Sequence, residues 1–163
     1  LWQTWERAID GILIWQTNFW HSDEAYPDVP QNPYEDPMGW TTGYSTPTGA
    51  KRPWGNGDGR FIYPPLAAAD CQPEMPVFDD PVSSIRLEML RDGIEDYEYC
   101  VILRDLLGKH RERLSEEEIK KYQKLLEVPK AITSSLTKFT WDPAPIEAHR
   151  ESVARAVEVL SKK

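Results

Sequence analysis

The 163 residues of the chain fit one ordinary domain and are enough to bury an apolar core. The formal net charge of −8, with no clustered basic stretch, argues against nucleic acid as a partner, because phosphates attract concentrated positive charge. No apolar run approaches the ~20 residues that cross a bilayer, so the sequence predicts no membrane span, and any targeting segment is expected upstream.

The first residues predict a short helix followed by a strand. Residues 1–9 suit one or two helical turns, and residues 11–20 are rich in β-branched and aromatic side chains, which favour a strand. The continuous apolar run at residues 12–15 is typical of a strand buried on both faces. Because a strand needs neighbours for its backbone donors and acceptors, we expect its partners in an N-terminal part upstream.

A long loop is predicted next, over residues 21–83. It is rich in proline, glycine and aspartate, and only residues 60–63 look extended. Loops much longer than ~12–15 residues are functional or disordered, and the many aromatic residues here argue against disorder. The sequence therefore predicts an active-site loop.

The rest of the chain is predicted to be helical. Ser83 or Ser84 can cap a helix to about Leu107, with Gly108 as its stop. Five acidic residues crowd this helix at spacings that include repulsive ones, so we expect several of them to pair with elements packed on the helix. These residues are Glu88, Asp92, Glu95, Asp96 and Glu98.

Three further helical segments follow in the prediction. Ser115 and Glu118 form a capping box that opens a second helix, which ends before Pro129. Residues 131–136 suit a short helical piece, and the last helix begins near Pro145. Its apolar face is expected to consist of Ile146, Val153, Val157 and Leu160.

A helix, a buried parallel-type strand, a long aromatic loop and another helix are together typical of a late βα unit in a (β/α)₈ barrel. We therefore predict an α/β fold, the C-terminal portion of a TIM barrel that is mostly helical within this chain. Residues 1–108 would hold the last βα units, with the active-site loop, and residues 109–163 the helices packed on the barrel.

Three segments resemble a known family. Residues 11–20 (GILIWQTNFW), 57–64 (GDGRFIYP) and 84–99 (SIRLEMLRDGIEDYEY) are similar, in order and spacing, to the end of the glycoside hydrolase family 123-like catalytic domain. Many members of this family are catalogued only as a domain of unknown function. The resemblance covers about residues 1–105 and is most specific in the third segment.

The resemblance implies a (β/α)₈ barrel that hydrolyses β-linked N-acetylhexosaminides through the acetamido group of the substrate. In the family an adjacent Asp-Glu pair, one residue orienting that group and the other acting as general acid, follows a middle strand. That position lies upstream of this chain, so we expect no catalytic residue here and no activity of the chain alone. The resemblance also favours an extracytoplasmic or secreted location. The acidic pair Asp23-Glu24 follows the wrong strand for the family pattern, and a loop role is favoured for it.

Six residues are candidates for substrate binding. Indole rings pack on the apolar faces of sugars, and amides bind sugar hydroxyls, so Asn18 and Trp20 suit one wall of the sugar site. Trp15 is instead assigned to the core, as are Trp2 and Trp5. The other four candidates lie in the loop, where the glycine-rich turn at residues 55–59 (GNGDG) also suits an anchoring role: Trp40, Trp54, Asp58 and Arg60.

No cofactor or metal is predicted, because the three histidines lack ligand spacing and the two cysteines form no CxxC. Two unpaired thiols are favoured for Cys71 and Cys100, although a disulfide stays open. Two alternative functions also stay open. The chain could be a noncatalytic carbohydrate-binding module, or a helical interaction domain in which the tryptophans belong only to the core.

Overall fold

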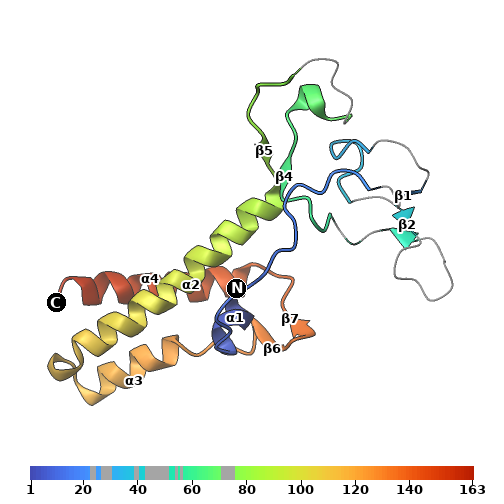
Figure 1. Cartoon of the computed structure of the whole chain (residues 1–163). Coiled ribbons are helices and arrows are strands. Elements are labelled where there is room, and N and C mark those ends of the chain that lie inside the picture. Colours follow the sequence, from blue (N-terminus) through green and yellow to red (C-terminus); the bar gives the residue numbers. More distant parts are fainter. Residues whose placement is uncertain are drawn as a thin grey trace. The chain divides into compact units, whose positions relative to one another are not determined.

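The computed structural model describes residues 1–22, 25–26, 31–38, 41–42, 52–53, 55, 57–70 and 76–163. The chain forms two compact units (Figure 1). The helical unit consists of Leu1–Ile12 and Leu90–Lys163, and the loop unit consists of Leu13–Met89. Within the described residues, no helix has the length and apolar character needed to cross a membrane.

The helical unit contains four α-helices, a 3₁₀ turn and one β-hairpin, with the first turns of α2 assigned to the loop unit. The elements are α1 (Trp2–Glu6), α2 (Ile85–Lys109), η2 (Arg111–Arg113), α3 (Glu116–Leu125), β6 (Thr133–Ser135), β7 (Lys138–Phe139) and α4 (Ala144–Ser161).

The loop unit contains short antiparallel strands and one 3₁₀ turn among the described residues. The order β1-β2-β3 forms one small sheet, and β4 pairs with β5 in the register Ile62 to Ser83. The elements are β1 (Ala25–Tyr26), β2 (Thr41–Thr42), β3 (Arg52–Pro53), β4 (Ile62–Tyr63), η1 (Leu66–Ala68) and β5 (Val82–Ser83). The extended piece predicted at residues 60–63 is confirmed at β4.

The predicted helix starts are confirmed. The Ser84 hydroxyl accepts hydrogen bonds from the amides of Arg86 and Leu87, at 3.2 and 3.4 Å, and thereby caps α2. Ser115 and Glu118 form the expected capping box of α3. The predicted stop at Gly108 is slightly wrong, because α2 continues to Lys109.

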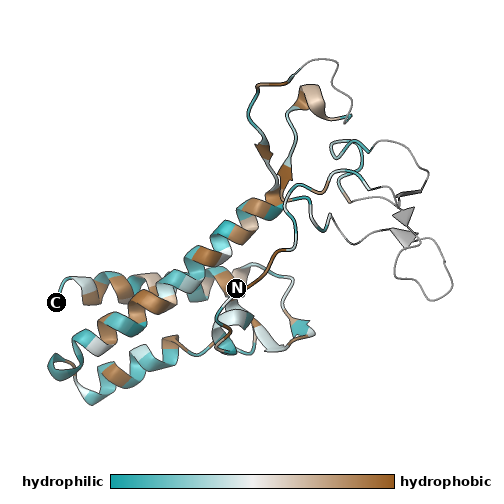
Figure 2. Ribbon diagram, in the orientation of Figure 1, coloured by the Kyte–Doolittle hydropathy of each residue, from teal (hydrophilic) through white to brown (hydrophobic). Residues whose placement is uncertain are grey.

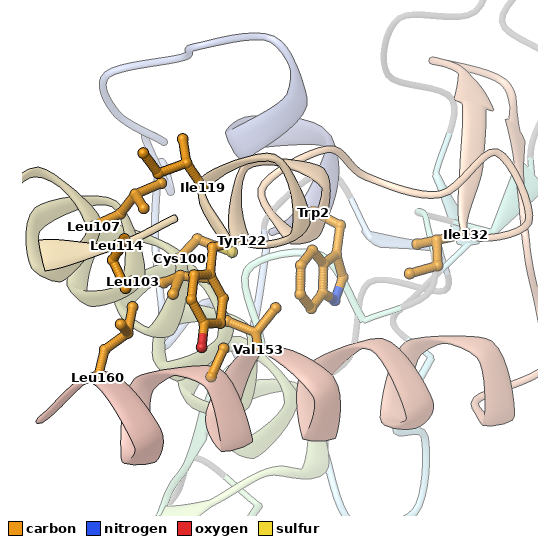
Figure 3. Packing of buried hydrophobic residues seen from close by; sticks show 11 residues of the cluster. Trp2, Cys100, Leu103, Leu107, Leu114, Ile119, Tyr122, Ile132, Val153 and Leu160 are labelled. Carbon is orange, nitrogen blue, oxygen red and sulfur yellow. The ribbon is translucent and has the colours of Figure 1, made fainter. Parts of the chain in front are cut away.

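One apolar core holds the helical unit together (Figure 3). Ile132 and Trp2 of α1 lie toward one end of the cluster in this view, and Leu103 of α2 belongs to the same cluster as Val153 and Leu160 of α4. The face predicted for the last helix is confirmed, since Val153 and Leu160 are fully buried and Ile146 and Val157 pack against the cluster. The assignments of Trp2 to the core and of Trp5 to its edge are likewise confirmed.

The thiol of Cys100 is free and buried in this core. Burial, reinforced by the nearby charge of Asp96, raises the pKa of the Cys100 thiol to about 12. Cys100 is therefore an inert core residue near neutral pH. Cys71 lies outside the described residues.

Asp96 confirms that an acidic residue of α2 pairs with a packed element. Its carboxylate is buried and accepts a hydrogen bond from the guanidinium of Arg150 on α4. That hydrogen bond is the main reason why the pKa of Arg150 is raised. The pair ties α2 to α4 by charge as well as by apolar contact.

Replacing Arg150 with methionine is expected to lower the free energy of unfolding by about 1–3 kcal/mol. The change leaves the Asp96 carboxylate buried without its cation, and the cost is below that of a fully buried pair because solvent reaches Arg150. Urea denaturation followed by circular dichroism measures the difference. The matched control is Arg155→Met on the same helix. This change removes an exposed ion pair with Glu151 and should lower the free energy of unfolding by under about 0.5 kcal/mol. Equal losses for both variants would contradict the argument.

His149 makes the stability of the helical unit depend on pH. Its ring packs edge-on against Trp2, with 5.0 Å between ring centroids, and burial is the main reason why its pKa is lowered from 6.5. The folded state therefore favours the neutral ring. Stability from this residue is complete above about pH 6.5 and is lost as the pH falls toward the lowered folded pKa, with a slope of at most about 1.4 kcal/mol per pH unit. Urea midpoints measured from pH 7.5 to 5 should decline less in His149→Gln than in the unsubstituted chain; parallel declines would refute this.

Two predicted elements are wrong. Residues 131–136 form no helix, because the Gln3 amide donates to Thr133 Oγ1 and to the Ser135 carbonyl, both at 3.0 Å, and holds the segment in the β6–β7 hairpin. Residues 11–20 form no regular strand; within the described part of the chain only Asn18 makes an isolated bridge, to Arg60.

The apolar run at residues 12–15 is also not buried within this chain. Leu13 is 87% exposed and Ile12 53%, and the ribbon that follows the N-terminal helix has the brown colour of hydrophobic residues in Figure 2. The physical reason is that no described strand lies beside it to make a ladder and cover its faces. The described residues contain no closed sheet, and the barrel and its division at residue 108 stay predictions.

Candidate functional site

The candidate site is formed by two segments of the loop unit, residues 15–20 and residues 57–62. The amide of Phe19 donates to the Gly59 carbonyl at 2.8 Å, and the amides of Phe61 and Ile62 donate to the Thr17 carbonyl at 2.8 and 2.9 Å. These backbone bonds bring together four of the six predicted binding residues: Asn18, Trp20, Asp58 and Arg60.

Arg60 is the structural centre of this pairing. Its side chain is fully buried, and its guanidinium donates to the carbonyls of Phe19 (3.4 Å), Trp20 (2.9 Å) and Asp36. A planar guanidinium has five donors and can therefore satisfy several carbonyls at once. This geometry agrees with the anchoring role considered for Arg60, and its contact with substrate stays a prediction.

Trp20 and Asn18 differ in exposure and in the hydrogen bonds that their side chains make within the protein. The indole Nε1 of Trp20 donates to the Ile62 carbonyl at 2.7 Å, and the ring is partly buried. Asn18 is exposed, and its side-chain amide makes no hydrogen bond with any of the described residues. The amide is thus available to a ligand, as expected for a sugar contact.

Asp58 is exposed and accepts a hydrogen bond from Trp15 Nε1 at 3.1 Å. The Trp15 ring also packs edge-on against Phe19, with 4.9 Å between centroids. Trp15 is 48% exposed, so its assignment to the core is wrong for this chain. The reason is again the missing neighbour of residues 12–15, which leaves the ring at a surface.

Sequence reasoning missed the role of Arg86 in this unit. Its guanidinium donates to the Pro37 carbonyl at 3.0 Å and occupies the space beside Gly57, where an added Cβ would lie 2.2 Å from Arg86 Cζ. The positive φ of +69° at Gly57 is the second reason for a glycine there. The glycine-rich turn was the sequence signal that could have indicated a close contact at Gly57. Nothing in the sequence identifies Arg86 as the residue that makes this contact.

A second missed feature is the pair Tyr34 and Tyr63. Their rings meet edge-on at 5.1 Å, and the Tyr34 hydroxyl donates to the Pro64 carbonyl at 2.7 Å. These contacts hold the described part of the loop in an ordered conformation, as its many aromatic residues predict.

Several candidates cannot be placed. Trp40, Trp54 and the acidic pair Asp23-Glu24 lie outside the described residues.

Within the described part, no group of His, Cys, Asp and Glu side chains could hold a metal ion. The helical unit has a cavity of about 340 Å³ between α1 and the β6–β7 hairpin, and none of the predicted binding residues lines it.

Comparisons of the chain with profiles of known protein families, with curated protein sequences and with solved structures give no match.

Proposed function

We propose that this chain forms one wall of the sugar site in a (β/α)₈-barrel glycoside hydrolase that acts on β-linked N-acetylhexosaminides. The observation that carries the proposal is the hydrogen-bonded pairing of residues 15–20 with the glycine-rich turn. This pairing gathers aromatic rings, an exposed amide and an exposed carboxylate, which is the chemistry that binds a neutral sugar.

The exposed run at residues 12–15 supports the barrel part of the proposal. Its side chains are those of a strand buried on both faces, yet Leu13 is 87% exposed here. An upstream part that supplied neighbouring strands would cover these side chains and bond their backbone groups. The same upstream part would carry the catalytic acid, and the protein as a whole would be extracytoplasmic or secreted.

Turnover of chromogenic β-N-acetylhexosaminides tests the proposal. We expect no activity from the 163-residue chain and activity from a longer polypeptide that includes upstream strands. Activity in the short chain would refute the absence of the acid. If no length of polypeptide turned over substrate, but a glycan quenched tryptophan fluorescence saturably, the chain would be a noncatalytic carbohydrate-binding module.

A helical interaction domain is the remaining alternative. The apolar core of the helical unit is consistent with it. That reading requires the tryptophans to be only core residues, whereas Trp15 is half exposed and Trp20 is partly exposed. The helical interaction domain would be favoured if replacing Asn18 with alanine changed the stability of the chain but not its glycan binding.

A further inference from the structure

We propose that the cavity between α1 and the β6–β7 hairpin binds a small neutral molecule with an aromatic or aliphatic body and one carbonyl or hydroxyl oxygen, which accepts the indole N–H of Trp2. The cavity lies within the helical unit and has a volume of about 340 Å³. This volume is at the lower end of the ~300–1,000 Å³ that is typical of small-molecule sites. The inference goes beyond the proposed function and does not depend on it, because none of the predicted sugar-binding residues lines the cavity.

The lining of the cavity suits an uncharged ligand that is mostly apolar. None of the nine lining side chains is charged, and the apolar ones are Leu1, Trp2, Ile132, Phe139 and Ile146. Phe139 is 46% exposed, so it lies where the cavity meets solvent, and its ring packs at 5.3 Å from the exposed ring of Trp141. An aromatic or aliphatic body would gain by leaving water for these walls, because the favourable free energy grows with the apolar area buried.

The indole N–H of Trp2 supplies the polar contact. Trp2 is 7% exposed, and its Nε1 has no hydrogen-bond partner among the described residues. The adjacent ring of His149 does not accept this N–H, since His149 Nε2 is also without a partner. In Figure 3 the indole nitrogen lies on the side of the Trp2 ring nearer to Ile132, which lines the cavity. Because an unpaired buried donor is costly, a ligand oxygen that reached it would add a hydrogen bond without breaking one inside the protein.

Three of the four polar side chains in the lining are already bonded within the protein. The Gln3 amide donates to Thr133 Oγ1 at 3.0 Å. The Thr133 hydroxyl donates to the Ser135 carbonyl at 3.1 Å, and the Thr140 hydroxyl donates to the Asp142 carbonyl at 3.1 Å. Few partners therefore remain for a ligand with many polar groups, such as a sugar, and a ligand with a single acceptor fits better.

Upstream residues of a longer polypeptide would not need to fill this cavity. None of residues 12–15 lines it, so covering that apolar run does not require closing the cavity. The backbone nitrogen of Leu1 lies against α2, where a Cβ added to Gly93 would be 3.1 Å from it, and no residue of α2 lines the cavity. A residue before Leu1 would therefore begin beside α2.

Titration of the intact chain with acetanilide, followed by NMR, tests the site, because this probe joins a phenyl ring to one carbonyl. We expect the indole N–H signal of Trp2 to shift downfield with saturation, at a Kd on the order of 1 mM. The internal control is Trp5 on the same helix, whose Nε1 already donates to the Leu126 carbonyl at 2.8 Å and whose signal should not change. Toluene, which has no acceptor, should bind without the downfield shift of Trp2.

Two variants test the donor and the cavity separately. Trp2→Phe keeps a ring in the core but removes the N–H, so it should weaken acetanilide binding about two- to tenfold and leave toluene binding unchanged. Thr4→Phe adds a ring to the lining and should abolish binding of both probes. Its matched control is Glu6→Phe, which adds the same ring at an exposed position of α1 outside the lining and should retain binding.

Several results would overturn the proposal. Shifts that do not saturate would exclude a built site, and saturable binding of acetanilide without a shift of Trp2 would exclude the N–H as its partner even if no variant folded. Equal losses of both probes in Trp2→Phe, or binding that disappears in a longer polypeptide, would likewise overturn it. None of these results concerns the turnover of β-N-acetylhexosaminides, so this proposal and the proposed function can fail separately.

Discussion

Replacing Arg60 with methionine is expected to open the loop unit. The Arg60 guanidinium is fully buried and donates to the carbonyls of Phe19, Trp20 and Asp36. Methionine fills part of the volume but leaves these acceptors without donors, and each unsatisfied buried group costs about 1–3 kcal/mol. We expect a total loss of several kcal/mol in the stability of this unit, mostly from the carbonyls of Trp20 and Asp36, because the contact with the Phe19 carbonyl is longer, at 3.4 Å.

Hydrogen exchange gives the measurement for Arg60→Met. The amides of Phe19, Phe61 and Ile62, which bond across the two paired segments, should exchange much faster, and the amides of α3 serve as an internal reference. Arg60→Lys keeps the charge but loses the planar fork, so its effect should lie between those of the original residue and methionine. Unchanged protection of the three amides in Arg60→Met would show that the guanidinium does not hold the segments together.

Replacing Leu103 with alanine is the second large expected effect. Leu103 is fully buried in the centre of the helical core, near Cys100 and Leu160 (Figure 3). The change removes apolar contacts and leaves a cavity, which together cost about 2–5 kcal/mol. Because small domains are stable by only about 5–15 kcal/mol, a large part of the stability of the unit would be lost.

Urea denaturation monitored by far-ultraviolet circular dichroism measures the Leu103→Ala effect. The neighbouring residue Ile102 is 41% exposed, so Ile102→Ala on the same turn of α2 is the matched control and should cost under about 1.5 kcal/mol. Both changes remove aliphatic groups from one helix, so a difference between them isolates burial from helix propensity. Similar losses would mean that the core does not centre on Leu103.

The helical half of the fold could be predicted from the sequence because its signals are local. Ser84, Ser115 and Glu118 cap helices through bonds to amides two or three residues away, and a sequence pattern contains both partners of such a bond. The apolar face of α4 likewise follows from periodicity, since residues three and four apart share one side of a helix.

Predictions that depended on distant partners were less successful. Residues 131–136 had an acceptable helical pattern, but Gln3, about 130 positions away, bonds Thr133 and holds the segment in a hairpin. Residues 11–20 have a composition that is typical of a strand, but they form no regular strand. A ladder needs a neighbouring strand, which the described residues do not supply.

For the candidate site, the sequence by itself determined the residue types: aromatic rings, an amide, an acidic residue and a glycine-rich turn that suit a neutral ligand. Only the tertiary structure decided their roles. It enclosed Arg60 among carbonyls from residues some 24 to 41 positions away and left Trp15 exposed with its indole bonded to Asp58. The physical reason is that exposure and hydrogen bonding depend on which distant backbone lies beside a side chain, and no local spacing encodes that neighbour.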